Sequence, residues 1–317
     1  MKYLAALVMA AMCAAFVVGY SPTTAIDCGG GDDDDDTGDD DTGDDDTGSG
    51  PDALKVITFN LRYANLVDFP NHWAARDGIV FDYLNGQSPD VFGVQEGLLK
   101  QLEDIEEGVP GYAWVGVSRY GNTDNEYSAV FYKTSRLELI DSGTFWLSDT
   151  PDVVGSKFSD AQSLPRICTW AELEIIDSGA RFFIFNSHWD TSNADSIPQR
   201  SAVVIIQKVA ELAPDAPVIV TGDFNENVGT AAYRIMTGAL TYNDVTGDFI
   251  DPWPVLDLPE GGTFHNFTGT PTSSSRIDWI LATDDFTPTA GEISTYNEDD
   301  KYPSDHFPVM VEYELGE

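Results

Sequence analysis

Six short apolar segments of this chain, rich in Val, Ile and Phe, each adjoin a small group of polar side chains. Such segments are typical of buried β-strands. Because the ends of buried strands meet at an edge of a rigid sheet core, polar groups placed there are expected to converge. The groups are Asn60-Leu-Arg62, Gln95-Glu96, Asn186-Ser-His188-Trp-Asp190, Asp223-Phe-Asn225, Arg276-Ile-Asp278 and Ser304-Asp305-His306.

Segments with helical spacing of apolar residues lie between the strand-type segments. Helices are predicted over Trp73–Leu84, Gly97–Glu107 and Ile197–Leu212. Both kinds of segment together predict an α/β protein with helices outside strand-rich sheets, although the pattern does not predict the strand order. The predicted strands are Leu54–Phe59, Val91–Val94, Ser128–Tyr132, Leu137–Ile140, Ile167–Ile176, Arg181–Asn186, Val218–Val220, Ile277–Ala282 and Pro308–Tyr313.

The polar groups carry hard oxygen ligands and few soft ones. Glu96, Asp223, Asn225 and Asp305 suit Mg²⁺, Mn²⁺ or Ca²⁺ better than zinc. Of the four His in the chain, two stand in these groups. The sequence has no Gly-x-Ser-x-Gly elbow, Walker loop, dinucleotide fingerprint or Cys-x-x-Cys pair. This argues against a covalent Ser or Cys mechanism and for metal-assisted chemistry.

The order and spacing of these groups resemble the signatures of the endonuclease/exonuclease/phosphatase superfamily. The resemblance runs from about Leu54 to Glu314 and also includes Glu126-Tyr127-Ser and Pro165-Arg166-Ile-Cys-Thr-Trp170. It looks closest to a secreted bacterial branch. It implies a deoxyribonuclease I-like fold, which is a four-layer α/β/β/α sandwich of two mixed β-sheets.

The resemblance also implies roles on the metal and water side of a site. Glu96 would be the principal metal ligand, with Asn60 beside it and Asp305 as a further ligand or support. The metal would be Mg²⁺, or else Mn²⁺ or Ca²⁺. Asp223 would orient and deprotonate the attacking water, and Asn225 would hold a phosphate oxygen.

Two His–carboxylate pairs are implied on the phosphate side. His188 would face the phosphate or the leaving oxygen with Glu126 as its partner, and His306 would be oriented by Asp278. A carboxylate partner holds a His in one tautomer and keeps it cationic near neutral pH. Arg166 matches an arginine that reaches phosphate in some members.

The resulting hypothesis is a metal-dependent hydrolase that cleaves a phosphomonoester or phosphodiester by in-line attack of an activated water. Nucleic acids, lipid head groups and small sugar phosphates all remain open as substrates. The alternative is a catalytically inactive surface binding module on the same fold, and a third is an acidic calcium buffer. The intact set of polar groups favours the enzyme, and we expect a monomer.

The charge of the chain limits its partners. The formal net charge is −38, and the eleven Asp of residues 32–46 leave −27 for the rest. Such a chain is not expected to hold a polyanion by neutralising phosphates. It could still meet nucleic acid transiently through bound cations.

The first residues differ from the rest in composition. Residues 1–27 place an apolar run behind Lys2 and predict a signal peptide, so an exported protein, secreted or anchored in a bacterial cell envelope. A retained anchor is the alternative, although the run is short for a membrane span. Residues 28–51 predict an Asp/Gly/Thr-rich disordered linker ahead of a catalytic domain at 52–317. Cys28 is a candidate lipid-anchor site, although Asp27 before it departs from the usual small residue.

Overall fold

The computed structural model describes residues 52–158, 164–191 and 196–316. The chain divides into two units, Met1–Thr47 and Gly48–Glu317, and the described residues all belong to the second. The predicted signal peptide, Cys28 and the linker lie outside the described residues and stay predictions. Among the helices that the structure does describe, none has the length and apolar character needed to span a membrane.

Two β-sheets form the centre of the second unit. In spatial order, the six-stranded sheet consists of β10 (Phe286–Ile293), β11 (Val309–Leu315), β1 (Ala53–Asn60), β2 (Val91–Gly97), β4 (Tyr127–Lys133) and β3 (Tyr112–Val115). The five-stranded sheet consists of β5 (Leu137–Trp146), β6 (Ile167–Ile175), β7 (Arg181–His188), β8 (Val218–Asp223) and β9 (Asp278–Ala282). Each sheet has one parallel pair, β1 with β2 and β7 with β8, among antiparallel ones. Both sheets are therefore mixed, as predicted.

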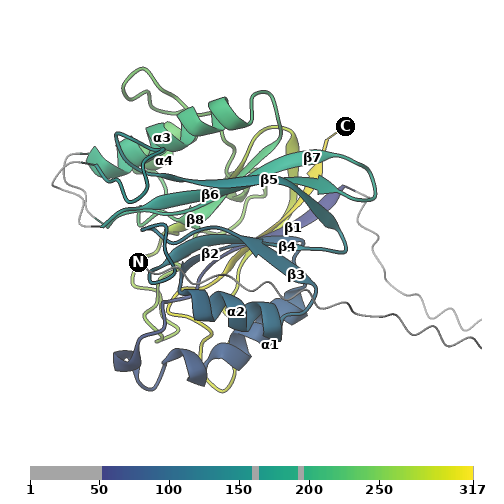
Figure 1. Cartoon of the computed structure of the whole chain (residues 1–317), viewed down its shortest axis with the longest axis vertical. Coiled ribbons are helices and arrows are strands. Elements are labelled where there is room, and N and C mark those ends of the chain that lie inside the picture. Colours follow the sequence, from purple (N-terminus) through teal and green to yellow (C-terminus); the bar gives the residue numbers. More distant parts are fainter. Residues whose placement is uncertain (1–51, 159–163, 192–195, 317) are drawn as a thin grey trace, which may run out of the picture. The chain divides into compact units, whose positions relative to one another are not determined.

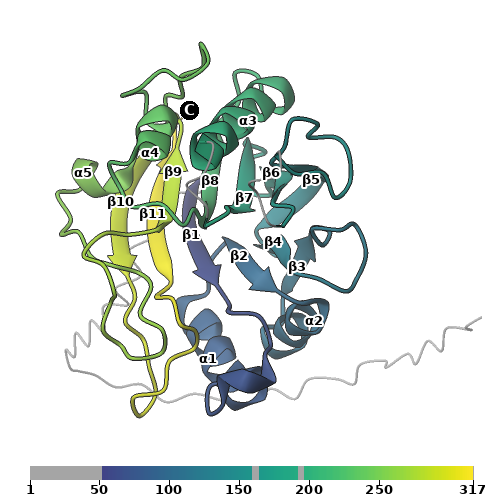
Figure 2. The same cartoon turned by 90° about the vertical axis from the view of Figure 1, so that its left-hand side faces the viewer.

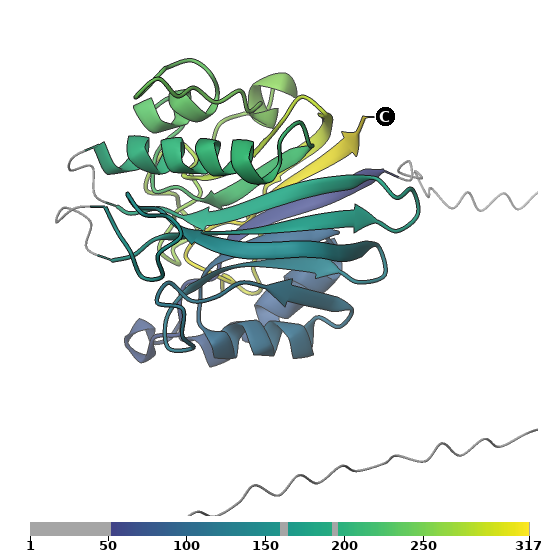
Figure 3. The same cartoon turned by 45° about the horizontal axis from the view of Figure 1, so that its top comes forward.

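Helices cover the two outer faces of the sheets. Figure 1 shows α3 and α4 outside the five-stranded sheet and α1 and α2 outside the six-stranded sheet, and Figure 3 shows α3 lying along its sheet. This arrangement confirms the four-layer α/β/β/α sandwich. The helices are η1 (Leu66–Asp68), η2 (Trp73–Ala75), α1 (Asp77–Gln87), α2 (Leu99–Gly108), α3 (Ile197–Leu212), α4 (Ala231–Met236) and α5 (Pro252–Val255).

Alternating side chains of each strand pack against different layers. On β1, Val56 belongs to the apolar cluster between the sheets, whereas Ile57 and Phe59 belong to the cluster beneath α1 and α2. Because successive side chains of a strand point to opposite faces, one strand supplies both clusters. Figure 2 shows the strands of both sheets in a view turned by 90° from that of Figure 1. The central strands β1, β2, β7 and β8 are buried on both faces, which explains why their sequences read as nearly continuous apolar runs.

A buried polar network joins the two sheets next to the apolar cluster. The Asn186 amide donates to the backbone oxygens of Val94 and Ala129, both at 2.9 Å. Its Oδ1 accepts from the Gln95 amide at 2.7 Å and from the Thr221 hydroxyl at 3.2 Å. Gln95 and Asn186 were expected at the edge of the sheets, but the structure places them inside. Their polar atoms bond across the sheets, so they fix the register of one sheet on the other.

This network predicts a large cost for a methyl group at Gly93. An added Cβ would lie 2.5 Å from both Asn186 Oδ1 and Thr221 Oγ1. Overpacking a core and breaking its hydrogen bonds should lower the free energy of unfolding of Gly93→Ala by about 2–3 kcal/mol. Gly86→Ala is the matched control, because nothing lies within 4 Å of its added Cβ in α1. It should be neutral or stabilising by about 0.5–1 kcal/mol. Equal denaturation midpoints for the two variants would contradict this account.

Candidate active site

Three of the predicted site residues lie side by side across the five-stranded sheet. His188 at the end of β7 pairs in register with Asp223 at the end of β8, and Asp223 pairs with Asp278 at the start of β9. Residues directly opposite each other point to the same face of a sheet. This face also carries Asn186 of the polar network, so the site occupies one end of the space between the sheets.

His306 reaches this row from the segment before β11. Its Nδ1 lies 2.9 Å from Asp278 Oδ2, and its Nε2 lies 3.8 Å from Asp223 Oδ2. Burial lowers the pKa of His306, but the charges of Asp278 and Asp223 outweigh burial and raise the pKa to about 10. His306 is therefore an imidazolium at neutral pH. The predicted contact between His306 and Asp278 is present.

Asp223 is buried and held by amide groups. Its Oδ2 accepts from the Asn60 amide at 2.8 Å, and its Oδ1 accepts from the backbone N–H of Asn225 at 2.9 Å. Burial and the charge of Asp278 raise the pKa of Asp223 to about 7, against the opposite effects of His306 and the two amide donors. A carboxylate with this pKa is well suited to take a proton near neutral pH.

His188 differs from the expected cationic histidine. Its Nε2 lies 3.0 Å from the Asn225 side-chain nitrogen, which can only donate, so Nε2 accepts. Burial lowers the pKa of His188 well below the usual value, and Arg166 and Arg119 lower it further. The 3.6 Å approach of Nε2 to Asp223 Oδ2 is therefore not an ion pair. His188 is a neutral imidazole in this structure.

Carboxylate oxygens that could bind a metal ion lie on the other side of Asp223. Glu96 Oε2 lies 3.9 Å from Arg62 Nη1, and Asp305 Oδ2 lies 3.9 Å from Arg62 Nε. Burial raises the pKa of Asp305, and the negative charge of Glu96 raises it further. Two carboxylates that repel each other beside an amide fit a divalent cation with oxygen ligands. The Asn60 amide nitrogen points at Glu96 Oε1 at 3.4 Å, while its Oδ1 accepts from the backbone of Arg62.

A buried arginine outside this group holds the loops that carry it. Arg76 donates to the backbone oxygens of Arg62 at 2.6 Å and Pro303 at 2.7 Å. The Ser304 hydroxyl donates to the backbone oxygen of Asn60 at 2.6 Å. These bonds tie the end of β1 to the segment with Asp305, so the oxygen donors come together although they are distant in sequence.

Asp223, Asp278 and His306 form a second buried group whose donor atoms lie within 4.8 Å of one another. Their spacing would allow a metal ion, but the bonding argues against one. Nδ1 of His306 is already hydrogen-bonded to Asp278 Oδ2 at 2.9 Å, so these two atoms satisfy each other within the group. The carboxylates of Glu96 and Asp305 are therefore the stronger candidates for metal ligands.

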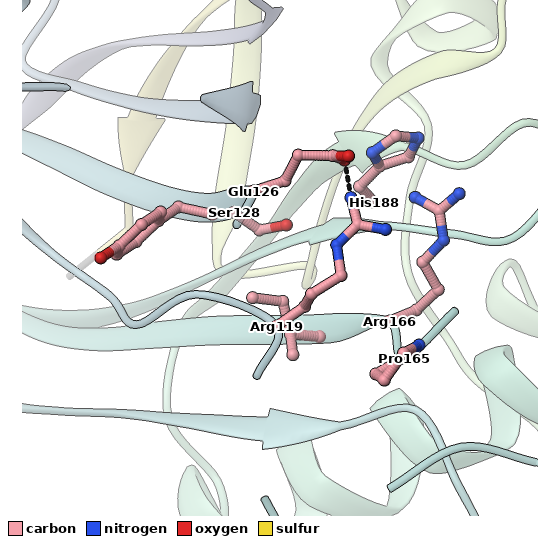
Figure 4. A pocket seen from close by; sticks show the side chains of 8 residues that line it. Arg119, Glu126, Ser128, Pro165, Arg166 and His188 are labelled. Atoms are coloured by element: carbon pink, nitrogen blue, oxygen red, sulfur yellow. Dashed lines mark ion pairs between the residues drawn. The ribbon is translucent and has the colours of Figure 1, made fainter. Parts of the chain in front are cut away.

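Most of the predicted site residues line one cleft of about 390 Å³. Asn60 and Asp278 lie behind its wall and bond to Asp223 and His306. Two arginines, Arg119 and Arg166, face His188 at one end of the cleft (Figure 4). The predicted residues that line the cleft are Glu96, Glu126, Arg166, His188, Asp223, Asn225, Asp305 and His306.

Comparison with known proteins identifies the family. The model of the Endonuclease/Exonuclease/phosphatase family matches residues 57–306. The chain belongs to this family. Solved structures of similar length agree. An endonuclease/exonuclease/phosphatase from Bacteroides vulgatus has 32% identity and a TM-score of 0.75, and the match covers 83% of this chain and 99% of that one.

A second solved structure, a mannosyl-6-phosphatase from Bacteroides thetaiotaomicron, also has 32% identity, with a TM-score of 0.72 and coverage of 82% of this chain and 99% of that one. The catalytic domain of human Nocturnin has 16% identity, a TM-score of 0.65 and coverage of 84% and 95%, and it supports the fold alone. A search of curated proteins found no match.

One contact implied by the family resemblance is not seen in this structure. Glu126 was expected to bond His188, but its carboxylate forms an ion pair with Arg119, as Figure 4 shows. The physical reason is that Arg119 is almost fully buried and needs a counter-charge, whereas His188 is neutral and does not. Arg119 was not among the site residues predicted from the sequence. Its only signal was that it is one of the 16 basic residues of a strongly acidic chain.

Proposed function

We propose that this protein is a metal-dependent phosphoester hydrolase in which a water bound beside Asp223 attacks phosphorus in line. The observation that carries the proposal is the row of His188, Asp223 and Asp278 across neighbouring strands, together with the hydrogen bond between His306 and Asp278. An arginine pair, Arg119 and Arg166, and a carboxylate pair, Glu96 and Asp305, line the same cleft. A phosphate ester resists nucleophiles because of its own charge, so cations around it and a positioned water are the main requirements.

Asp223 is the group that takes the proton from water. The amide of Asn60 and the backbone N–H of Asn225 fix its two oxygens, so its free lone pairs have a defined direction. His306, kept cationic by Asp278, presents Nε2–H towards the same space and stabilises charge that develops on the phosphate or the leaving oxygen. Asn225 and His188 support this arrangement through their mutual hydrogen bond.

Glu96 and Asp305, with Asn60 beside them, would hold a divalent cation such as Mg²⁺. When bound, the ion would act as a Lewis acid on a phosphate oxygen. Its oxygen ligands fit Mg²⁺ or Mn²⁺ better than zinc. The set of site residues is complete, which favours an enzyme over an inactive binding module.

Metal removal tests this part of the proposal. Dialysis against EDTA should abolish hydrolysis, and Mg²⁺ or Mn²⁺ should restore it. Glu96→Gln should raise the Mg²⁺ concentration that gives half-maximal activity by about tenfold or more, because it removes one ligand charge. Glu103→Gln on the exposed face of α2 is the control and should not change that concentration. Full activity after exhaustive chelation would refute metal dependence.

The substrate is proposed to be a small phosphate ester. The similar structure named as a mannosyl-6-phosphatase supports this, and so does the net charge of −38, which disfavours stable contact with nucleic acid. Phosphate release from mannose 6-phosphate and glucose 6-phosphate should be compared with cleavage of plasmid DNA and RNA under the same metals. On the strength of residues 1–27, we also propose that the enzyme works outside the cytoplasm.

A further inference from the structure

Two guanidinium groups meet at the end of the cleft beside His188. The side chain of Arg119 is 3% exposed and that of Arg166 is 11% exposed. Among the described residues, Arg119 Nη1 and Arg166 Nε and Nη1 are buried without a hydrogen-bond partner. A buried donor without a partner is costly, so such groups in a cleft indicate the place of a ligand.

Both guanidinium groups have carboxylates nearby, and both keep N–H donors without a hydrogen-bond partner. Glu126 forms an ion pair with Arg119, and Asp190 lies 3.9 Å from Arg166 Nε. Burial, and then the nearby Arg166, lowers the pKa of Arg119 to about 10, so Arg119 stays cationic at neutral pH. The charges of Glu96 and Asp190 act on both guanidinium groups, and that of Asp223 acts on Arg166. Both arginines line this end of the cleft beside His188 (Figure 4).

We propose that Arg119, together with Arg166, binds the non-bridging oxygens of a terminal phosphate and so selects phosphomonoesters over phosphodiesters. The proposal rests on the phosphoester hydrolysis proposed above and names its substrate class. Arg119 is a specificity-determining residue in this scheme, and Glu126 holds it in place.

The chemistry of the two ester classes explains the selection. At neutral pH a phosphomonoester carries nearly two negative charges and three terminal oxygens. A diester carries one charge, and its second ester group replaces one of those oxygens. Planar guanidinium groups bind such oxygens in a bidentate manner, and they would lose one acceptor with a diester. The wall formed by Tyr127, Pro165 and Ile167 also encloses this end of the cleft.

The test compares p-nitrophenyl phosphate with bis-p-nitrophenyl phosphate, which have the same leaving group. Arg119→Ala should lower kcat/KM for the monoester at least tenfold while changing it less than threefold for the diester, and Arg119→Lys should fall between. Arg181→Ala is the control, because this exposed arginine lies at the opposite end of β7 and should leave both values unchanged. If Arg119→Ala does not fold in a thermal melt, Arg119→Lys provides the comparison.

Calorimetric titration with inorganic phosphate gives a readout that does not need activity. The Kd for phosphate should rise at least tenfold in Arg119→Ala and by a smaller factor in Arg119→Lys. If the wild-type protein hydrolysed neither ester with any divalent metal, the proposed function would fail, while the phosphate titration would still decide the role of Arg119. Equal loss on both esters, a preference of the wild type for the diester, or an unchanged Kd would overturn the inference.

Discussion

Replacing His306 by Gln is expected to lower kcat by about 10² or more with little change in KM. The reason is that the imidazolium acts on charge that develops only in the transition state. Its bond of 2.9 Å to Asp278 and its pKa of about 10 keep it charged throughout the neutral range. Steady-state kinetics at saturating Mg²⁺ is the measurement. His72→Gln, in a histidine outside the cleft at the start of η2, is the control and should change kcat less than twofold.

A double-mutant cycle separates His306 from its partner. Asp278→Asn should reproduce part of the loss, because the imidazole would lose its orienting carboxylate and its charge. The double variant should then lose less activity than the product of the two single losses. Multiplicative losses would mean that Asp278 acts on something other than His306.

The burial of this pair dictates the choice of substitution. His306 and Asp278 are 6% and 1% exposed. Alanine at His306 would leave a buried carboxylate with neither its counter-ion nor a hydrogen-bond donor, which costs about 3–5 kcal/mol and would mix a folding defect with the kinetic one. Gln retains an amide donor of similar length. Thermal melting alongside the kinetics shows whether the variant is folded, and a folded His306→Gln enzyme with wild-type kcat would contradict the assignment.

The sequence predicted the fold well where burial determines the pattern. The helix predicted at Ile197–Leu212 is present with the same ends, and the central strands fall where the apolar runs are. Strand β10 was missed because Thr287, Pro288 and Gly291 hide its pattern. This strand lies at the edge of its sheet and has a register irregularity at Pro288, which is where proline is tolerated. The short β3, with four residues, gave too little periodicity to detect.

The candidate site was predictable only in part. Asp223 and Asp278 end or begin buried strands, so their meeting follows from strand pairing. The partner of Glu126 does not follow in this way, because it depends on how the loop with Arg119 folds back onto the start of β4. The protonation states of the two histidines could not be predicted from the sequence either. Whether a histidine is cationic, like His306, or neutral, like His188, depends on burial and neighbouring charges that come from other strands.

The increase of kcat/KM with pH on the acid side of the profile should follow the titration of Asp223. Because the pKa of Asp223 is raised to about 7 and only the carboxylate accepts a proton, kcat/KM should increase with pH through about 7 and level off above it. It should fall again near pH 10, where His306 loses its proton.

Asp223→Asn should lower kcat by about 10²–10⁴, and its residual activity should lack the acid limb. An unchanged limb in that variant would assign the titration to another group. Asn60→Ala should move the limb to higher pH, because the lost amide bond no longer favours the charged form of Asp223.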